Sequence, residues 1–158
     1  MDEARCQSLI DDYYRINPEV KLYSQDRVVK ARRNGYARDM FGRIRYIPEL
    51  SCPIRRIESE GARQAANMPI TAGAQGIIKL ATKRLKESRD QHQLPFQFLL
   101  QVHDELIFEV KEEFLDMGFT DWAETVMEGV VRLEVPVVAE SKTGERWGSL
   151  RKVEDIGR

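Results

Sequence analysis

The segment FQFLLQVHDELIFEV, residues 96–110, places three polar side chains between two strand-like apolar runs. The runs are rich in phenylalanine, leucine, isoleucine and valine, of which the aromatic and β-branched residues favour strands. His103, Asp104 and Glu105 stand where a hairpin would turn. A tight turn projects adjacent side chains from the rim of a sheet and can hold them rigidly. The segment therefore predicts a β-hairpin that carries an imidazole and two adjacent carboxylates at its tip.

The two carboxylates at this tip have a specific chemical use. Neighbouring acids repel each other unless a cation or a proton compensates. Mg²⁺ prefers a few carboxylates together with water and substrate phosphates, and phosphoryl transfer uses carboxylates held where phosphates arrive. Asp104 and Glu105 are therefore candidate magnesium ligands. The alternative is a purely structural turn, in which His103 and Asp104 are ordinary polar turn residues and Glu105 faces water.

The composition is that of an ordinary globular chain. Its 158 residues are 42% hydrophobic and 32% charged, which predicts one domain with a real core. No apolar run approaches the length of a membrane span, so we expect no membrane association. Cys6 and Cys52 are too few for a disulfide framework, and we expect two reduced thiols in an intracellular, cytoplasmic protein. His92 and His103 are the only histidines, which argues against a zinc site.

The near-neutral net charge of −1 hides a basic segment. Between residues 27 and 63 there are ten lysines and arginines and four acids, a difference of +6. Such a surface can neutralise phosphates and attract a polyanion. The alternative is a solvated charged face without a ligand.

Helices and strands are interspersed without a βαβ rhythm, which predicts an α+β fold with an antiparallel hairpin sheet packed against several helices. We expect Asn17 to cap a second helix that ends at Gly35. Pro69 should interrupt the helix that follows Pro53, because proline removes a backbone donor. The expected elements are helices over 3–14, 17–34, 54–67, 70–88 and 111–130, hairpins over 36–47 and 96–110, and a closing strand and loop over 135–147.

The helix after Pro53 has a polar stripe. At 100° per residue, Arg56, Arg63 and Asn67 fall within roughly 40° of one another. Arginine and asparagine suit phosphates and the acceptor-rich minor groove of a duplex. A solvated face, with Glu58 and Glu60 paired to arginines, is the alternative. The residues expected to pack inward are Ile54, Ile57, Gly61 and Ala65.

An ordered set of motifs covers nearly the whole chain, from about residue 2 to residue 150. GYARDMFGRIRYIPEL is followed by RRIESEGARQAANMPITAGAQGIIKLA, then by QVHDE on the predicted hairpin, and finally by GERW. In this order and with these residues the chain resembles the carboxy-terminal palm region of family A (DNA polymerase I-like) DNA polymerases.

The resemblance implies roles for individual residues. Asp104 matches the palm aspartate that helps hold two magnesium ions between the primer 3′ hydroxyl and the incoming deoxynucleoside triphosphate, and Glu105 matches the neighbouring acid. His103 and Gln101 match positions near the primer terminus. The positions matching residues that hold the template-primer duplex are Arg45, Arg63 and Asn67, with Arg56 on the same predicted stripe.

Two departures from the family pattern qualify these expectations. Thr71 stands where the family usually has a glutamine that reads the minor groove, and Gln75 follows one helical turn later as a possible substitute. The second metal-binding aspartate and the fingers helix that grips the triphosphate are not found. The Tyr-Ser-Gln of residues 23–25 only superficially resembles the missing aspartate motif, and Asp11 and Asp12 suit a helix surface.

The site is therefore expected to be partial. Residues 1–35 would be helices leading from the fingers side and residues 36–158 a palm portion, together forming one partial polymerase domain. The isolated chain should be inactive until an upstream polymerase half or segment supplies the missing aspartate and fingers. Two other hypotheses remain: a non-catalytic duplex-DNA-binding module derived from a polymerase, and a metal-dependent nuclease.

Overall fold

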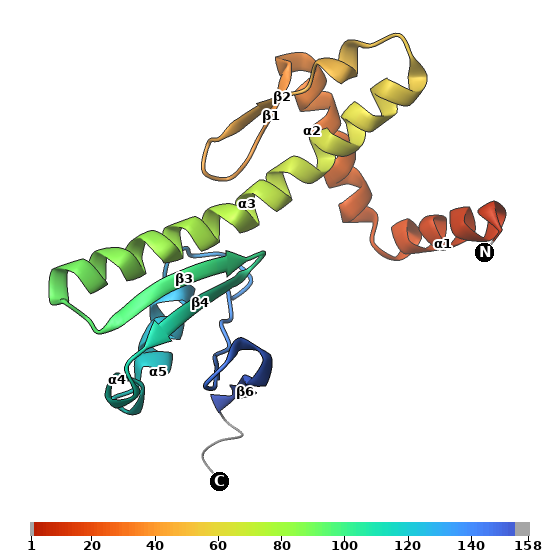
Figure 1. Cartoon of the computed structure of the whole chain (residues 1–158). Coiled ribbons are helices and arrows are strands. Elements are labelled where there is room, and N and C mark those ends of the chain that lie inside the picture. The colour runs from red at the N-terminus through yellow and green to blue at the C-terminus, as the bar shows by residue number, and fades with distance from the viewer. Residues whose placement is uncertain (1, 154–158) are drawn as a thin grey trace. The chain divides into compact units, whose positions relative to one another are not determined.

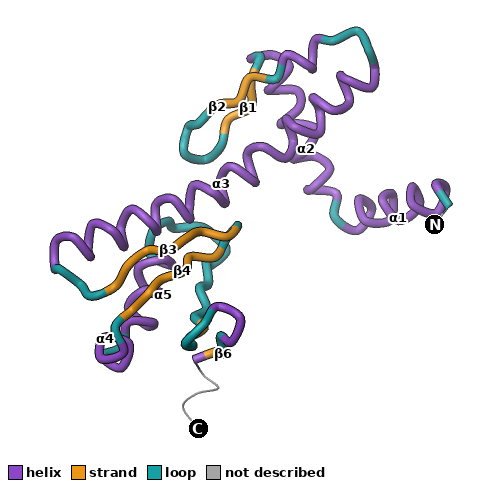
Figure 2. Tube along the Cα trace, viewed as in Figure 1, coloured by secondary structure: helices purple, strands orange, loops and turns teal. Residues whose placement is uncertain are grey.

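The computed structural model describes residues 2–153, with helices and short antiparallel strand pairs (Figures 1 and 2). The chain forms two compact units that divide between Gly73 and Ala74. The predicted α+β class is confirmed. The elements are α1 (Glu3–Ile16), α2 (Pro18–Asn34), β1 (Tyr36–Arg38), β2 (Ile44–Tyr46), the 3₁₀ helix η1 (Pro48–Ser51), α3 (Arg55–His92), β3 (Phe96–Val102), β4 (Glu105–Val110), α4 (Glu112–Asp116), α5 (Phe119–Glu128), β5 (Lys142–Thr143), the 3₁₀ helix η2 (Trp147–Ser149) and β6 (Arg151–Lys152).

The first unit is organised around the end of α2. Gly35 ends this helix as predicted, with φ of 79°, and its N–H donates to the Ala31 carbonyl at 2.8 Å. The N–H of Ile47 donates in turn to the Gly35 carbonyl, so the β1–β2 hairpin is fastened to the helix end. The buried hydrophobic side chains of this unit form one small core, made of Ala31, Ala37, Ile47, Leu50 and Ala65.

Asn17 does not cap α2 as predicted. Its Nδ2 donates to the Tyr13 carbonyl at 3.0 Å, and its side chain makes no capping bond to α2. The side chain therefore satisfies the last turn of α1, which extends to Ile16, two residues beyond the prediction. Pro18 starts α2 without the help of a side-chain cap because its φ is already helical.

Pro69 lies inside α3 and does not interrupt it, which corrects the prediction of two helices. Proline removes one backbone hydrogen bond, at a cost of about 3 kcal/mol in a helix interior. Buried residues on both sides of it, Ala65 before and Ala81 and Leu85 after, hold the helix in place. Ile54 precedes the first turn of α3 and is 57% exposed, so the expectation that it packs inward was wrong.

The second unit is built on the β3–β4 hairpin. Phe96 pairs with Val110 and Val102 with Glu105, and an irregularity lies between Phe98 and Leu100. One face of the hairpin packs on α5 through an aromatic cluster. Its rings lie 4.7–5.9 Å apart between centroids and belong to Phe96, Phe98, Phe108, Phe114, Phe119 and Trp122.

Two further predictions for this unit need correction. The helix expected over residues 111–130 is divided into α4 and α5 at Gly118, whose φ is 92°. Residues 135–141 do not form a strand, and Val135 and Val138 are more than 70% exposed. Strand-like residues adopt a strand only where a partner strand accepts their hydrogen bonds, and the strands that follow up to residue 153 are the two of the short β5–β6 pair.

Within residues 2–153, no helix is both long enough and apolar enough to cross a bilayer.

The packing of α3 against η1 gives a test of the first unit. A Cβ added at Gly61 would lie 2.9 Å from Glu49 Cβ and 3.0 Å from the Leu50 nitrogen. We therefore expect Gly61→Ala to lower the free energy of unfolding by about 1–3 kcal/mol, measured by urea denaturation. Gly73→Ala is the control on the same helix, because its Cβ would meet Met40 Sδ only at 3.6 Å. It should leave stability unchanged or raise it, and equal effects of the two changes would contradict the close contact.

Candidate functional site

The hairpin tip presents the two predicted carboxylates to solvent. His103 and Asp104 form a two-residue turn that is closed by the pairing of Val102 with Glu105. The side chains of Asp104 and Glu105 are both exposed. The aromatic cluster anchors the base of this hairpin, where Phe96 and Phe98 lie on β3 and Phe108 lies on β4.

The turn adopts a conformation that is unfavourable for most residues. His103 has φ of 53°, in the left-handed region, which costs roughly 1–2 kcal/mol for a residue with a side chain. Its carbonyl accepts hydrogen bonds from Gln101 Nε2 at 2.9 Å and from Gln75 Nε2 at 3.3 Å. The structure thus brings together three of the predicted site residues, Gln75, Gln101 and His103, beside the two acids.

The two carboxylates are the type of ligand that a divalent cation prefers, but two carboxylates alone do not complete its coordination. Carboxylate oxygens are the ligands that Mg²⁺ prefers, and Mg²⁺ keeps water and phosphate ligands as well. Within residues 2–153, no group of three or more acidic, histidine or cysteine side chains is placed to hold a metal ion. Asp104 and Glu105 could therefore form part of a magnesium site whose other oxygen ligands come from elsewhere.

The predicted polar stripe exists on the first half of α3. The side chains of Arg56, Arg63 and Asn67 are all exposed. Arg56 and Arg63 line a hollow of about 370 Å³ together with Ile57 and Glu60. A hydrogen bond from Arg63 lowers the pKa of the Glu60 carboxyl.

Some of these basic residues have partners within the first unit. Arg63 pairs with Glu60 and Arg32 pairs with Glu58, as the solvated-face alternative expects. Arg45 donates to Gln64 Oε1 at 2.9 Å. These are exposed or half-exposed pairs, which contribute little to stability and can exchange for phosphate contacts. In the part of the chain that is described, Arg56 makes no ion pair.

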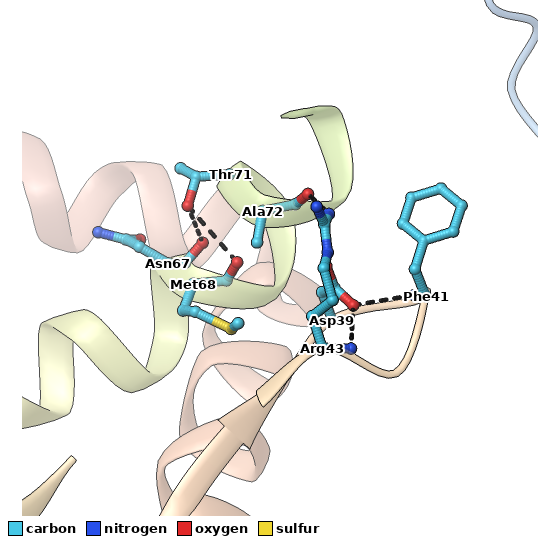
Figure 3. Close-up of polar contacts among 7 residues, drawn as sticks. All are labelled: Asp39, Phe41, Arg43, Asn67, Met68, Thr71 and Ala72. Atoms are coloured by element: carbon cyan, nitrogen blue, oxygen red, sulfur yellow. Dashed lines mark hydrogen bonds and ion pairs between the residues drawn. The ribbon is translucent and has the colours of Figure 1, made fainter. Parts of the chain in front are cut away.

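Thr71, at the position where the resembling family has glutamine, directs its hydroxyl to its own helix. The hydroxyl donates to the Asn67 carbonyl at 3.1 Å and lies 3.5 Å from the Met68 carbonyl (Figure 3). Because the hydroxyl is bonded to its own helix, Thr71 has only its methyl group free to contact the minor groove of a duplex. The Asn67 side chain extends away from this contact and is exposed (Figure 3).

The structure also contains a polar cluster that the sequence reasoning missed. Asp39 is 5% exposed, and its carboxylate accepts the N–H groups of Phe41 and Arg43 at 2.9 Å each and Arg43 Nε at 2.7 Å. Arg43 also donates to the Ala72 carbonyl on α3 (Figure 3). An aspartate placed just before a glycine-containing turn, as in DMFGR, is the signal that could have revealed it.

The contacts of Asp39 make its negative charge contribute to the stability of the fold. Burial by itself raises the pKa of this carboxyl, but the hydrogen bonds from Arg43 and from the two backbone N–H groups outweigh burial and lower the pKa. Because the pKa of the folded state lies below the ordinary value of about 3.9, the stabilisation is complete above that pH. It is lost as the pH falls through the folded-state pKa.

Asp39→Asn tests this contribution. The asparagine amide carries no negative charge, so the charge-assisted hydrogen bond with the Arg43 guanidinium is lost. We therefore expect the free energy of unfolding at pH 7 to fall by about 1.5–3 kcal/mol. The loss of stability between pH 5 and pH 2 should also be smaller in the variant than in the unchanged protein. The matched control is Asp12→Asn, which removes an exposed pair with Arg15 and should change stability by about 0.5 kcal/mol or less. An unchanged acid dependence in Asp39→Asn would contradict the assignment.

The predicted site residues therefore fall into two groups, which belong to different compact units. The first unit carries the residues predicted to hold the duplex, Arg45, Arg56, Arg63, Asn67 and Thr71. The second unit carries the hairpin residues Gln101, His103, Asp104 and Glu105, with Gln75 from α3.

Comparison with known proteins covers almost the whole chain. Residues 1–149 match the family described as DNA polymerase family A. The chain is 34% identical over 147 residues to the thermostable DNA polymerase I of Thermus aquaticus and 37% identical over 140 residues to DNA polymerase I of Bacillus subtilis. These alignments cover 93% and 89% of this chain but only 17% and 16% of the relatives, so the chain spans about one sixth of their length.

A solved structure matches as well. It is the POL domain of Pol1 from Mycobacterium smegmatis in complex with DNA primer-template and dNTP. The match has a TM-score of 0.80 with 32% identity and covers 86% of this chain and 24% of that one. The sequence motifs, the hairpin that carries adjacent acids and these similarities lead to one conclusion: the chain belongs to DNA polymerase family A.

Proposed function

We propose that this chain is the carboxy-terminal palm part of a template-directed DNA polymerase, which adds deoxynucleotides to a primer 3′ end in DNA replication or repair. The observation that carries the proposal is the pair of exposed carboxylates, Asp104 and Glu105, at the tip of a rigid hairpin in a chain of this family. The transfer of a nucleotidyl group requires acids at a fixed point where a triphosphate and a primer end can meet.

The hairpin tip would supply the acids of a two-metal site. Asp104, supported by Glu105, would hold Mg²⁺, which on binding polarises the reacting phosphate and lowers the pKa of the primer hydroxyl. The two-residue turn places both carboxylates side by side at the end of the hairpin. His103 and Gln101 stand next to these acids and would contact the primer terminus.

The first half of α3 would bind the template-primer duplex. Arg56 and Arg63 line one hollow and are suited to phosphate oxygens, with which arginine forms paired hydrogen bonds. Asn67 can donate to minor-groove acceptors, whose pattern varies little with sequence. Such contacts read the shape of a duplex, as a polymerase requires. Further residues proposed for the duplex are Arg45 on β2 and Thr71 and Gln75 on later turns of α3.

The site would be completed by another polypeptide segment, on this chain or on a second one. Within the described residues the tip offers two carboxylates, which are too few to balance two divalent ions. The relatives are about six times longer than the region they share with this chain. We propose that residues 1–35 lead from the fingers side and that residues 36–158 are the palm portion. The remaining segment would supply the second aspartate and the grip on the deoxynucleoside triphosphate.

A second candidate function is duplex-DNA binding without catalysis. The excess of bases over acids between residues 27 and 63 and the small number of carboxylates at the tip favour it. This alternative requires only phosphate contacts, which neutralise charge and weaken with salt. It predicts that DNA binding survives the loss of both acids and that no assembly of the chain extends a primer.

The catalytic proposal is tested in a chimera in which residues 1–149 replace the matching segment of the Mycobacterium smegmatis polymerase domain. The remainder of that domain would supply the second aspartate and the grip on the deoxynucleoside triphosphate. We expect Mg²⁺-dependent primer extension by the chimera and a loss of about 1,000-fold or more in kcat for Asp104→Ala, because an essential electrostatic group is removed. The measurement is single-nucleotide extension of a labelled primer.

Asp116→Ala is the matched control, since Asp116 is exposed at the end of α4 in the same unit. It should extend primers at the rate of the unchanged chimera. Circular dichroism and primer-template binding show whether each variant is folded. A folded chimera that binds primer-template but does not extend it would refute the catalytic proposal and leave the binding module. Full activity in Asp104→Ala would remove the metal role.

The duplex surface is tested on the chain itself. Arg56→Ala and Arg63→Ala should each weaken binding to duplex DNA of any sequence. Each should also reduce the slope of log K against log salt by about 0.9, the value for one phosphate contact. Fluorescence anisotropy over a salt series measures both quantities. Arg132→Ala removes an exposed arginine outside the basic segment and should change neither. Equal slopes in all four proteins would contradict the assigned contacts.

A further inference from the structure

Two glutamine side chains from different elements meet at the strained turn of the hairpin. Gln75 lies on α3, and Gln101 is the penultimate residue of β3. Both Nε2 atoms are hydrogen-bonded to the carbonyl of His103, at 3.3 and 2.9 Å. Gln101 Nε2 also donates to Gln75 Oε1 at 3.2 Å. The three residues therefore form a closed ring of hydrogen bonds.

The chemistry of the ring leaves little choice in how the amides are oriented. A backbone carbonyl only accepts hydrogen bonds, so each glutamine must turn its NH₂ group toward His103. Once Gln101 is oriented in this way, its second N–H can donate a hydrogen bond to Gln75 Oε1. Both lone pairs of the His103 carbonyl are then used, and one N–H of Gln75 remains for another acceptor.

The ring acts on a peptide plane that determines where the acids stand. The His103 carbonyl belongs to the peptide bond that joins His103 to Asp104, and φ of His103 is 53°. A histidine in this left-handed region is strained and persists only where its surroundings hold it. The hydrogen bonds from Gln75 and Gln101 fix the orientation of the peptide plane immediately before Asp104.

We propose that Gln75 and Gln101 are positioning residues, which lock the turn and thereby hold the Asp104 carboxylate at its working angle. This inference rests on the proposed catalytic function for its purpose, but the lock itself is a property of the chain alone. Gln75 matters most, because it ties the turn to α3 rather than to its own strand. The sequence suggested Gln75 only as a substitute for the missing glutamine at position 71; the contacts assign it a further task.

The test compares substitutions at Gln75 that preserve length and helix propensity. Gln75→Met keeps the bulk of the side chain and removes the hydrogen bonds. Gln75→Glu keeps the shape and removes the donor. In both variants we expect the backbone ¹⁵N order parameters of His103 and Asp104 to fall from a rigid value of about 0.85 toward about 0.6. The thermal midpoint should remain within about 2 °C of the unchanged protein, because the ring is exposed.

Gln91→Met is the matched control, on an exposed glutamine of the same helix. It should leave the turn rigid. In the chimera, Gln75→Met should lower kcat for primer extension about tenfold with KM for the nucleotide unchanged, since a misaligned group affects the chemical step. Gln75→Asn keeps the amide but is one methylene shorter, so it should not form the hydrogen bond to the His103 carbonyl that Gln75 makes at 3.3 Å. Its kcat should therefore be as low as that of Gln75→Met.

The outcomes separate this inference from the catalytic proposal. Order parameters that stay near the rigid value in both Gln75→Met and Gln75→Glu would overturn the lock, whatever the chimera does. A rigid turn in Gln75→Glu alone would overturn the role of the donated hydrogen bond. A turn that loosens as expected, in a folded chimera that does not extend primers, would support the lock and refute the polymerase function.

Discussion

The burial of Phe96 between the hairpin and α5 is the interaction on which the second unit depends. Its side chain is 3% exposed, and its ring lies 5.1 Å from that of Phe119 and 5.7 Å from that of Phe108. An isolated two-stranded hairpin is marginally stable in water. Packing one face of β3 and β4 on a helix through large aromatic rings supplies the missing stabilisation. This contact anchors the base of the hairpin, while the hydrogen bonds of Gln75 and Gln101 to the His103 carbonyl act at its tip.

The two kinds of charge that the proposed reaction uses belong to different compact units. The acids stand at a turn, and within residues 2–153 neither carboxylate forms an ion pair, so in the proposed reaction both would be available to a cation. The arginines lie on an exposed helix face and on β2, where exposed ion pairs can exchange for phosphates at small cost. Asp39 differs from these acids, because its carboxylate is buried and hydrogen-bonded to Arg43. Its charge therefore stabilises the fold and is not available to a ligand.

The hairpin, its two acids and the polar stripe on α3 could be predicted from the sequence. Each depends on local patterns, either apolar runs around polar residues or a spacing of seven and four residues on one helix. The predicted break at Pro69 was wrong, because the cost of one lost hydrogen bond competes with buried side chains on both sides of it. The closing strand expected within residues 135–147 forms only as β5 at Lys142–Thr143 and not near Val135, because strand propensity has little effect without a partner strand.

The hydrogen bonds of Arg43 to the Ala72 carbonyl and of Gln75 to the His103 carbonyl could not be predicted, since each joins residues far apart in the chain. Arg43 and Ala72 are 29 positions apart, and Gln75 and His103 are 28. By itself the sequence determined the class of fold and the position of the two acids in a turn, because these follow from short-range patterns, and the resemblance of its ordered motifs to family A polymerases indicated the family. Only the tertiary structure decided which distant polar groups meet, because a hydrogen bond depends on positions in space that the packing of helices and strands sets.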